Sequence, residues 1–341
     1  MTHRCQAPVC HISKWRRDLN ERERWFAQRT YHHGDFADIE KLIAVKEEQG
    51  LEISVCLPTL NVRSTVGRIL KVIRTELVER HHLIDELAII DSRSTDGTIE
   101  AARAGGASVL FDDEILPGLE PAYGKGEALW KSLFALKGDI IVWVDSDIKN
   151  MHPRFVYGLL GPLLTEPGVS YVKGFYERPL KEGRVTRPTG GGRVTELVVR
   201  PILNLFYPDL ACLIQPLSGE YAGRRSLLES VPFMTGYGVE TGLLLDIYNE
   251  FGLWSLAQVD LEVREHYNQT LEALSRMSFG VLQAVFKKLD SDDKVELKSE
   301  PETVYNAIKR KGGKYLVKET EIKVVERPPM MTIADYRRRG I

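Results

Sequence analysis

The stretch DIIVWVDSD, Asp139 to Asp147, decides how this 341-residue chain is interpreted. Its apolar run, Ile140 to Val144, consists of β-branched and aromatic residues. Such a run predicts a strand that is buried on both faces, as in the middle of a parallel sheet. Asp145 and Asp147 follow where this strand ends, and residues two apart in an extended segment project to the same side. The pair predicts a site for one hard divalent cation, with solvated loop or helix-capping carboxylates as the alternative.

The composition excludes several classes of function. Lys and Arg together number 46 against 48 for Asp and Glu, which predicts no general attraction to nucleic acid or acidic membranes. No apolar run reaches the roughly 20 residues of a membrane-spanning helix, and the N-terminus lacks a signal-peptide stretch. Four cysteines are too few for a disulfide framework. We therefore expect a cytoplasmic protein with neither a nucleic-acid nor a membrane partner.

Four predicted strands alternate with helical segments in the first half of the chain. They are Ile53 to Leu57, Leu87 to Ile90, Ala107 to Phe111 and Ile140 to Val144. This alternation predicts an open α/β sheet. No G-x-G-x-x-G follows the first strand, which argues against a Rossmann dinucleotide site.

Polar residues follow these strands at the edge where ligands of open α/β sheets bind. Those expected to collect there are Asn61, Asp91, Ser92, Lys125, Asp145 and Asp147. Gly124, Lys125 and Gly126 at a helix start can present backbone N–H groups and one cation to a phosphate. Gly126 stands where a Walker A motif needs Ser or Thr, so a P-loop is excluded. The convergence predicts a combined metal and nucleotide site.

The second half offers further candidates. Three glycines, Gly190 to Gly192, precede Arg193 at a predicted helix start, which predicts a second anion site; a loop with a solvated Arg193 is the alternative. His266 leaves a predicted strand as the two aspartates do, so it either completes the metal site or is structural. Glu240 is either catalytic or a favourable charge at a helix start. The apolar stripe from Leu274 to Leu289 predicts packing rather than a lipid site.

With these pieces placed, the chain resembles the retaining GT-A glycosyltransferases that make glucosyl-3-phosphoglycerate and their mannosyl-3-phosphoglycerate relatives. The resemblance extends from about Ser54 to about Ser278. It rests on LPTLN (57–61), DSRSTDGT (91–98), GKGEALW (124–130), VDSD (144–147), GGGRVTELV (190–198), QPLSGEYA (215–222) and GYGVE (236–240). The D-x-D motif alone indicates only the broad GT-A class. The GGGRVTE and QPLSGEYA segments together are far more specific, because the first resembles that family's 3-phosphoglycerate cradle.

The resemblance implies a GT-A fold with a Rossmann-like, mostly parallel central sheet flanked by helices and an acceptor-binding second half. The expected division is a polar, partly helical extension (1–50), a nucleotide-sugar-binding half (51–150), an acceptor-binding half (151–290) and a C-terminal extension (291–341). A homodimer is also expected.

The resemblance also implies roles for individual residues. The donor would be bound by Pro58, Thr59, Leu60, Asn61, Ser92, Lys125 and Asp145. Asp145, Asp147 and His266 would hold Mg²⁺ or Mn²⁺, and the acceptor would be bound by Gly191, Gly192, Arg193, Thr195 and Asn268. Val62 and Arg63 stand where family members usually have two acidic residues, so this departure bears on the choice between uridine and guanosine donors.

The expected reaction moves glucose or mannose from a nucleotide-diphosphate sugar to the 2-hydroxyl of 3-phosphoglycerate with retention. UDP-glucose, GDP-glucose and GDP-mannose are the candidate donors, and the product would be a precursor of the compatible solutes glucosylglycerate or mannosylglycerate. The expected catalytic groups are Asp147, the Leu217 carbonyl, Glu240 and Arg264. A polyprenyl-phosphate glycosyltransferase, a sugar nucleotidyltransferase and a non-catalytic nucleotide-sugar-binding protein are the alternatives.

Overall fold

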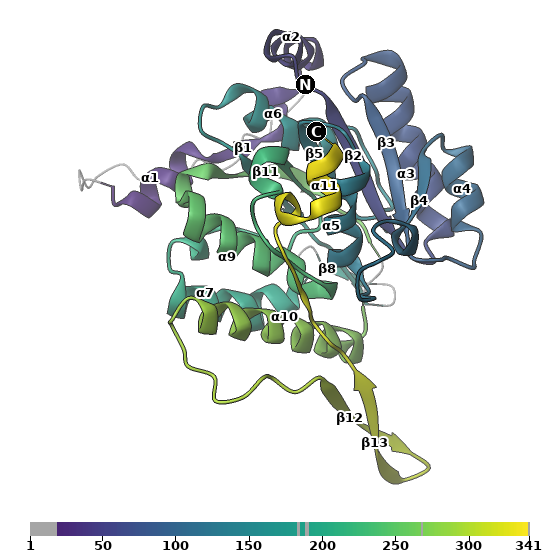
Figure 1. Ribbon diagram of the computed structural model, residues 1–341, viewed down its shortest axis with the longest axis vertical. Helices are drawn as coiled ribbons and strands as arrows, with labels where there is room; N and C mark the ends of the chain where they lie inside the picture. Colours follow the sequence, from purple (N-terminus) through teal and green to yellow (C-terminus); the bar gives the residue numbers. More distant parts are fainter. Residues whose placement is uncertain (1–18, 183–184, 188–190, 267–268, 340–341) are drawn as a thin grey trace.

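The computed structural model describes residues 19–182, 185–187, 191–266 and 269–339, and an eight-stranded sheet forms its centre (Figure 1). The strand order is β1-β11-β6-β9-β5-β2-β3-β4. The strands are β1 (Thr30–His32), β2 (Ile53–Thr59), β3 (Glu86–Asp91), β4 (Ser108–Phe111), β5 (Ile140–Trp143), β6 (Tyr171–Glu177), β9 (Tyr221–Arg224) and β11 (Leu256–Val263). Only β9 runs antiparallel to its neighbours within this sheet. The predicted mostly parallel sheet is confirmed.

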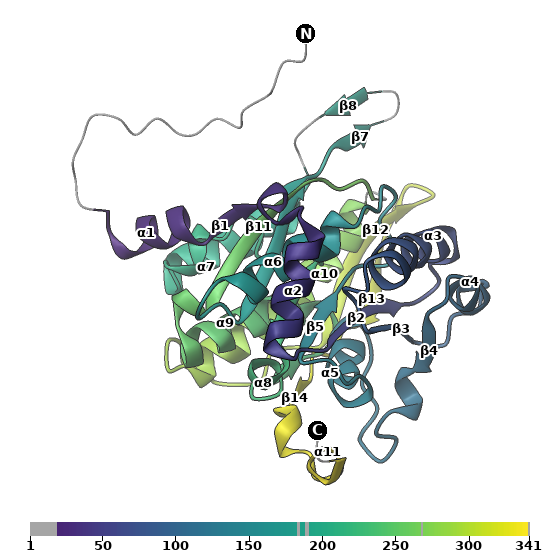
Figure 2. The ribbon, with the colours of Figure 1, turned by 90° about the horizontal axis from the view of Figure 1, so that it is seen from above.

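Helices cover both faces of the sheet. They are α1 (Glu21–Gln28), α2 (Ile39–Gln49), α3 (Arg63–Ile73), α4 (Thr98–Ala104), α5 (Lys125–Ala135), α6 (Arg154–Thr165), α7 (Arg200–Phe206), α8 (Arg225–Leu228), α9 (Val239–Phe251), α10 (Leu271–Ser291) and α11 (Ala334–Arg339). Helices α3 and α4 pack together at the β3–β4 end of the sheet, while α1 lies at the β1 end (Figure 2). In the described part of the chain, no helix combines the length and the apolar character needed to cross a bilayer.

The structure of β5 explains why every residue from Ile140 to Val144 is apolar. Ile141 and Trp143 point into the core shared with α5, α9 and α10, whereas Ile140, Val142 and Val144 point into the core shared with α2, α3 and α6. All five side chains are fully buried. The two cores are separated by the sheet, so the prediction of a strand buried on both faces is confirmed.

Several elements were not predicted from sequence. Strand β1 is only three residues long, and β9 (YAGR) contains a glycine and a terminal arginine, so neither gives a clear apolar pattern. Helix α3 is followed directly by a π-helical segment, Arg74–Arg80, which no local sequence signal indicates. Three small sheets add β7 (Leu180–Glu182) with β8 (Val185–Arg187), β10 (Phe233–Met234) with β14 (Glu326–Arg327), and β12 (Val304–Lys311) with β13 (Lys314–Glu321).

Candidate active site

A cavity of about 600 Å³ opens at one edge of the central sheet. The carboxyl ends of β2, β3, β5, β6 and β11 meet there because these strands are parallel. The antiparallel strand β9 begins at the same edge, so the chain that precedes it also reaches the cavity. The lining includes Pro58, Thr59, Leu60, Ser92, Lys125, Asp145, Asp147, Gly191, Gly192, Arg193, Thr195, Leu217, Glu240, Arg264 and His266. The sequence-predicted sites for donor, metal and acceptor therefore share one cavity.

Two cations, Lys125 and Arg264, pair with the three carboxylates that line the cavity, and Arg264 also pairs with the buried Glu220. Lys125 Nζ lies 2.5 Å from Asp145 Oδ1 and 2.7 Å from Glu240 Oε1. Arg264 Nη2 lies 3.0 Å from Asp145 Oδ2 and 2.7 Å from Asp147 Oδ1. Asp145 is thus shared between the lysine that begins α5 and the arginine that follows β11. This arrangement places positive charge on both sides of the D-x-D pair.

The protonation states of the predicted metal ligands suit a divalent cation. Burial raises the pKa of Asp145, but the neighbouring Lys125 and Arg264 outweigh it and hold that pKa well below its usual range. Burial, with Arg264 and Arg178 nearby, lowers the pKa of His266 to about 4. At neutral pH the site therefore offers an ionised carboxylate and a neutral imidazole, and both can ligate Mg²⁺ or Mn²⁺.

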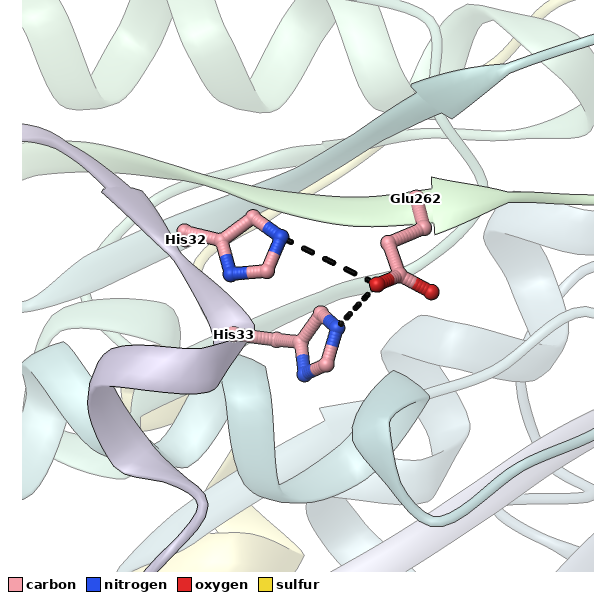
Figure 3. A group of neighbouring side chains, drawn as sticks. All are labelled: His32, His33 and Glu262. Atoms are coloured by element: carbon pink, nitrogen blue, oxygen red, sulfur yellow. Dashed lines mark ion pairs between the residues drawn. The ribbon is translucent and has the colours of Figure 1, made fainter. Parts of the chain in front are cut away.

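The three predicted metal ligands, Asp145, Asp147 and His266, line one cavity, but their ligating atoms do not form a close group. Among the described residues, only His32, His33 and Glu262 place three such atoms within 4.8 Å of one another (Figure 3). Asp145 and Asp147 instead contact the same Arg264 nitrogen. A cation bound by these aspartates would take over contacts that Arg264 makes here.

Local contacts explain why these three side chains lie together. His32 caps the short helical turn His33–Phe36, and His33 lies 3.1 Å from Glu262. His32 Nδ1 accepts a hydrogen bond from the Gly34 N–H at 3.0 Å, so the neutral ring carries its proton on Nε2, the nitrogen that faces Glu262. A protonated nitrogen has no lone pair for a metal. Arg154 Nη1 lies 3.4 Å from the other carboxylate oxygen of Glu262. These contacts account for the cluster without a bound ion.

Strand β6 fixes the turn that precedes β9. The fully buried Lys173 donates from Nζ to the Ser218 carbonyl at 2.7 Å, and Gly174 N–H donates to the Glu220 carbonyl at 2.9 Å. Gly219 lies so close to Asp145 that a Cβ on it would stand 1.8 Å from Oδ2. Leu217 and Gly219 both line the cavity as a result.

The predicted acceptor segment also lines the cavity. Gly192 has a φ of 76°, which favours glycine, and Gly191 lies against Arg178, where a Cβ would approach the Arg178 Cβ to 2.4 Å. Arg193 Nη2 donates to the Gln269 carbonyl at 3.1 Å. Thr195 is buried at the start of a π-helical turn, Thr195–Val199. Gly191 lets the backbone pass close to Arg178, which follows β6, and Gly192 supplies the positive φ.

Two predicted residues, Asn61 and Arg63, do not line the cavity, and a third is not described. Asn61 is absent from the cavity lining, because its Oδ1 accepts from the Thr95 N–H at 3.0 Å and holds the loop after β2. Arg63 is exposed beside Gly97 and does not line the cavity, although Val62 does. Asn268 lies outside the described residues. The acceptor role of Asn268 and the donor role of Asn61 stay predictions.

Other lining residues were missed in the sequence. They are chiefly Tyr123, Arg178, Tyr237, Leu274, Met277 and Val281. Arg178 follows the carboxyl end of β6, so the rule that identified Asp145 also applied to it. Leu274, Met277 and Val281 belong to the stripe predicted as packing, and that prediction was incomplete because these three side chains also wall the cavity.

Comparison with known proteins agrees with this geometry. The model for "Glycosyl transferase family 2" matches residues 54–237. The glucosyl-3-phosphoglycerate synthase of Petrotoga mobilis is 50% identical over 312 residues, which cover 92% of this chain and 96% of that protein.

Two crystal structures are also similar. The mannosyl-3-phosphoglycerate synthase of Rubrobacter xylanophilus superposes with a TM-score of 0.84 at 40% identity, covering 91% of this chain and 99% of that one. The glucosyl-3-phosphoglycerate synthase of Mycobacterium tuberculosis, in complex with Mn²⁺, uridine-diphosphate-glucose and phosphoglyceric acid, gives 0.76 at 41% identity, covering 89% and 98%. The GT-A fold expected from sequence is confirmed. The chain belongs to glycosyl transferase family 2 and, within it, to the glucosyl-3-phosphoglycerate synthase family.

Proposed function

We propose that the protein transfers glucose or mannose from a nucleotide-diphosphate sugar to the 2-hydroxyl of 3-phosphoglycerate, with retention of configuration. One observation carries the proposal: the Lys125–Asp145–Arg264 cluster and the Gly191–Thr195 segment line the same 600 Å³ cavity. A volume of this size is typical of small-molecule sites. Two anion-binding walls that face one space suit a reaction between two phosphorylated substrates.

Each wall has a separate task. Asp145, Asp147 and His266 would hold Mg²⁺ or Mn²⁺, which supplies charge neutralisation for the departing nucleoside diphosphate. Lys125 and Arg264 add fixed positive charge at the same place, a kind of electrostatic stabilisation worth several kcal/mol. Arg193 and the glycine backbone would hold the acceptor so that its hydroxyl faces the sugar. The Leu217 carbonyl would orient that hydroxyl.

Glu240 orients the sugar in this proposal and does not attack it. Its carboxylate is buried and lies 2.7 Å from Lys125 Nζ, which neutralises it. Glu240→Gln is expected to lower kcat about tenfold while anomeric retention is kept, because a sugar contact is weakened and no covalent step is lost. NMR of the product reads both quantities. Complete loss of turnover together with an azide-rescued product of inverted configuration would instead establish a nucleophile.

The donor is identified by direct assay. The purified protein is incubated with Mg²⁺ or Mn²⁺, 3-phosphoglycerate and, separately, UDP-glucose, GDP-glucose or GDP-mannose, and the product and its anomeric configuration are read by NMR. Asp145→Asn is the negative control. Product that forms only with 3-phosphoglycerate is the expected result. Its absence with all three donors would refute the proposal and favour a non-catalytic nucleotide-sugar-binding protein.

The cytoplasm is the proposed location. Cys56 and Cys212 are free thiols, and Cys56 is fully buried within β2. Unpaired thiols suit a reducing compartment. We further propose that residues 51–150 recognise mainly the donor and residues 151–290 mainly the acceptor.

A further inference from the structure

Strand β11 carries one extra residue just before it reaches the cavity. Asp260 faces Phe175 of β6, but Val263 faces Glu177, so the two strands fall out of step by one residue between these pairs. Such an insertion is a β-bulge, and within it Glu262 takes a φ of 65°, which side chains rarely adopt. In a regular ladder Glu262 would face Glu177, and each later residue would stand one place further along β6. The bulge therefore decides which side chain the end of β11 presents to the cavity.

The β1 edge of β11 loses its partner strand at the same place, because the pairing with β1 ends at Asp260. Beyond this point the Arg264 N–H still donates to the Glu177 carbonyl of β6, at 3.0 Å. Successive residues of a strand direct their backbone groups to opposite edges. Those of Val263 and Glu265 thus face the edge that β1 has left, and they need other partners.

The side chain of Asn150 takes the place of the missing strand. Its Nδ2 donates to the Val263 carbonyl and its Oδ1 accepts from the Glu265 N–H, each at 2.8 Å. The amide brackets Arg264 with one donor and one acceptor, as a residue of a neighbouring parallel strand does. The Lys149 N–H adds a bond to the Glu265 carbonyl, also at 2.8 Å.

Other side chains hold the bulge itself. Arg154 of α6 donates from Nε to the Leu261 carbonyl at 2.8 Å, and its Nη1 lies 3.4 Å from Glu262. His33 lies 3.1 Å from the same carboxylate (Figure 3). These contacts fix the bulge, whereas Asn150 fixes the residues that follow it.

We propose that Asn150 is a positioning residue for the transfer reaction, because it joins the loop of Asp145 and Asp147 to the segment that carries Arg264. Asn150 follows Asp147 closely in the chain, so its two hydrogen bonds connect the end of β5 to the end of β11 across β9 and β6. Arg264 Nη2 contacts both aspartates across the same gap. The inference rests on the proposed function, in which Arg264 neutralises the departing diphosphate, and it adds the residue that holds Arg264 in place.

Steady-state kinetics at saturating Mn²⁺ tests the proposal. Asn150→Ala is expected to lower kcat at least about tenfold and to leave the KM for 3-phosphoglycerate within about twofold of wild type, because Arg264 is displaced while the acceptor segment is intact. Asn150→Asp keeps the size and the acceptor atom but loses the donor to Val263, so its kcat should also fall. Asn204→Ala is the control, since Asn204 is exposed and donates to the Arg200 carbonyl within α7. Its kinetics should match wild type.

A double-mutant cycle separates positioning from a general structural role. In an Arg264→Met background, Asn150→Ala should lower kcat by less than about twofold further, because the group that it positions is gone. Equal losses in the two backgrounds overturn the proposal, and so does a wild-type kcat in Asn150→Ala.

Hydrogen exchange gives a measurement that is independent of turnover. In Asn150→Ala the Glu265 amide should exchange at least about tenfold faster than in wild type or Asn204→Ala, as followed by mass spectrometry of peptides that span residues 261–266. Unchanged exchange in Asn150→Ala overturns the role of Asn150. A wild type that forms no product, but whose Glu265 amide depends on Asn150, refutes the proposed function and confirms the connection between the two loops.

Discussion

Gly219 lies directly against the carboxylate of Asp145, where a Cβ would stand 1.8 Å from Oδ2. Gly219→Ala must therefore displace either the turn before β9 or Asp145 itself. We expect kcat/KM to fall by at least about 100-fold with little change in melting temperature, because a displacement near 1 Å at a reacting centre costs that much. Steady-state kinetics and a thermal melt measure the two quantities.

Gly118→Ala is the control for this prediction. Gly118 is exposed, and a Cβ placed on it would meet no other atom within 4 Å, so wild-type kinetics are expected. Wild-type kcat/KM in Gly219→Ala would show that the close approach has no part in catalysis.

Lys173 predicts a pH dependence of stability. Burial lowers its pKa to about 7, although Glu240 raises it. Between pH 7 and the unfolded lysine value near 10.4, the unfolded state binds more protons, so the free energy of unfolding rises with pH. This group contributes up to about 1.4 kcal/mol per pH unit. Urea unfolding at several pH values should show wild type gaining stability relative to Lys173→Met as pH rises from 7 to 9.

Lys137→Met serves as the comparison, because Lys137 is exposed and its loss should leave the pH slope unchanged. Equal slopes for wild type and Lys173→Met would contradict the assignment of a depressed pKa to Lys173.

A residue of the site could be predicted from sequence when it directly follows a strand, because the direction of the strand then decides at which edge of the sheet the residue lies. Asp145, Asp147 and His266 follow apolar strands, and parallel strands bring such positions to one edge. The partners of these residues were not predictable, because the Arg264 contact to both aspartates depends on β11 lying three strands away from β5. For Asn61, the predicted position after a strand was correct, but its side chain does not reach the cavity. It accepts a hydrogen bond from the Thr95 N–H instead.

At the scale of the element, Arg327 in β14 (Glu326–Arg327) holds the C-terminal part of the chain against α5. Arg327 donates to both oxygens of the fully buried Glu127, at 2.8 and 2.9 Å, and to the Glu120 carbonyl. Arg327→Met leaves Glu127 with Lys131 alone, and removing one member of such a buried pair costs about 3 to 5 kcal/mol. Urea unfolding measures this loss.

Two further variants complete this test. Glu127→Gln combined with Arg327→Met should recover part of the loss, because the uncompensated buried charge is removed. Arg338→Met, at an exposed arginine of α11, should have no measurable effect. Stability equal to wild type in Arg327→Met would mean that the pair contributes nothing net.

Elements were predictable in proportion to their local signal. Strands β2, β3 and β5 are continuous apolar runs, and Asp38 and Gly50 bound α2 as capping and left-handed residues. Strands β1 and β9 carry no such pattern, because their place in the sheet is decided by distant partners, β11 for the first and β5 and β6 for the second.

At the scale of the whole molecule, the β12–β13 hairpin is separable from the body. Ile322 N–H donates to the Thr303 carbonyl at 2.7 Å, so the two ends of the hairpin lie side by side. Replacing residues 304–321 with two glycines is expected to keep the melting temperature within about 4 °C of wild type. Far-UV circular dichroism follows the melt. An unfolded product would show that the hairpin is required for the fold itself.

The antiparallel course of β9 has a consequence for how the enzyme could diversify. The chain leaves the sheet at the cavity after β2, β3 and β5, which carry the proposed donor residues, but it enters the sheet from the cavity through the turn before β9, which carries the proposed acceptor contact Leu217. Mutations in that incoming stretch can therefore alter which hydroxyl compound is accepted while leaving nucleotide recognition intact. Under the proposed division of the chain, donor and acceptor preference would be encoded in different parts of the gene, and selection could act on each alone.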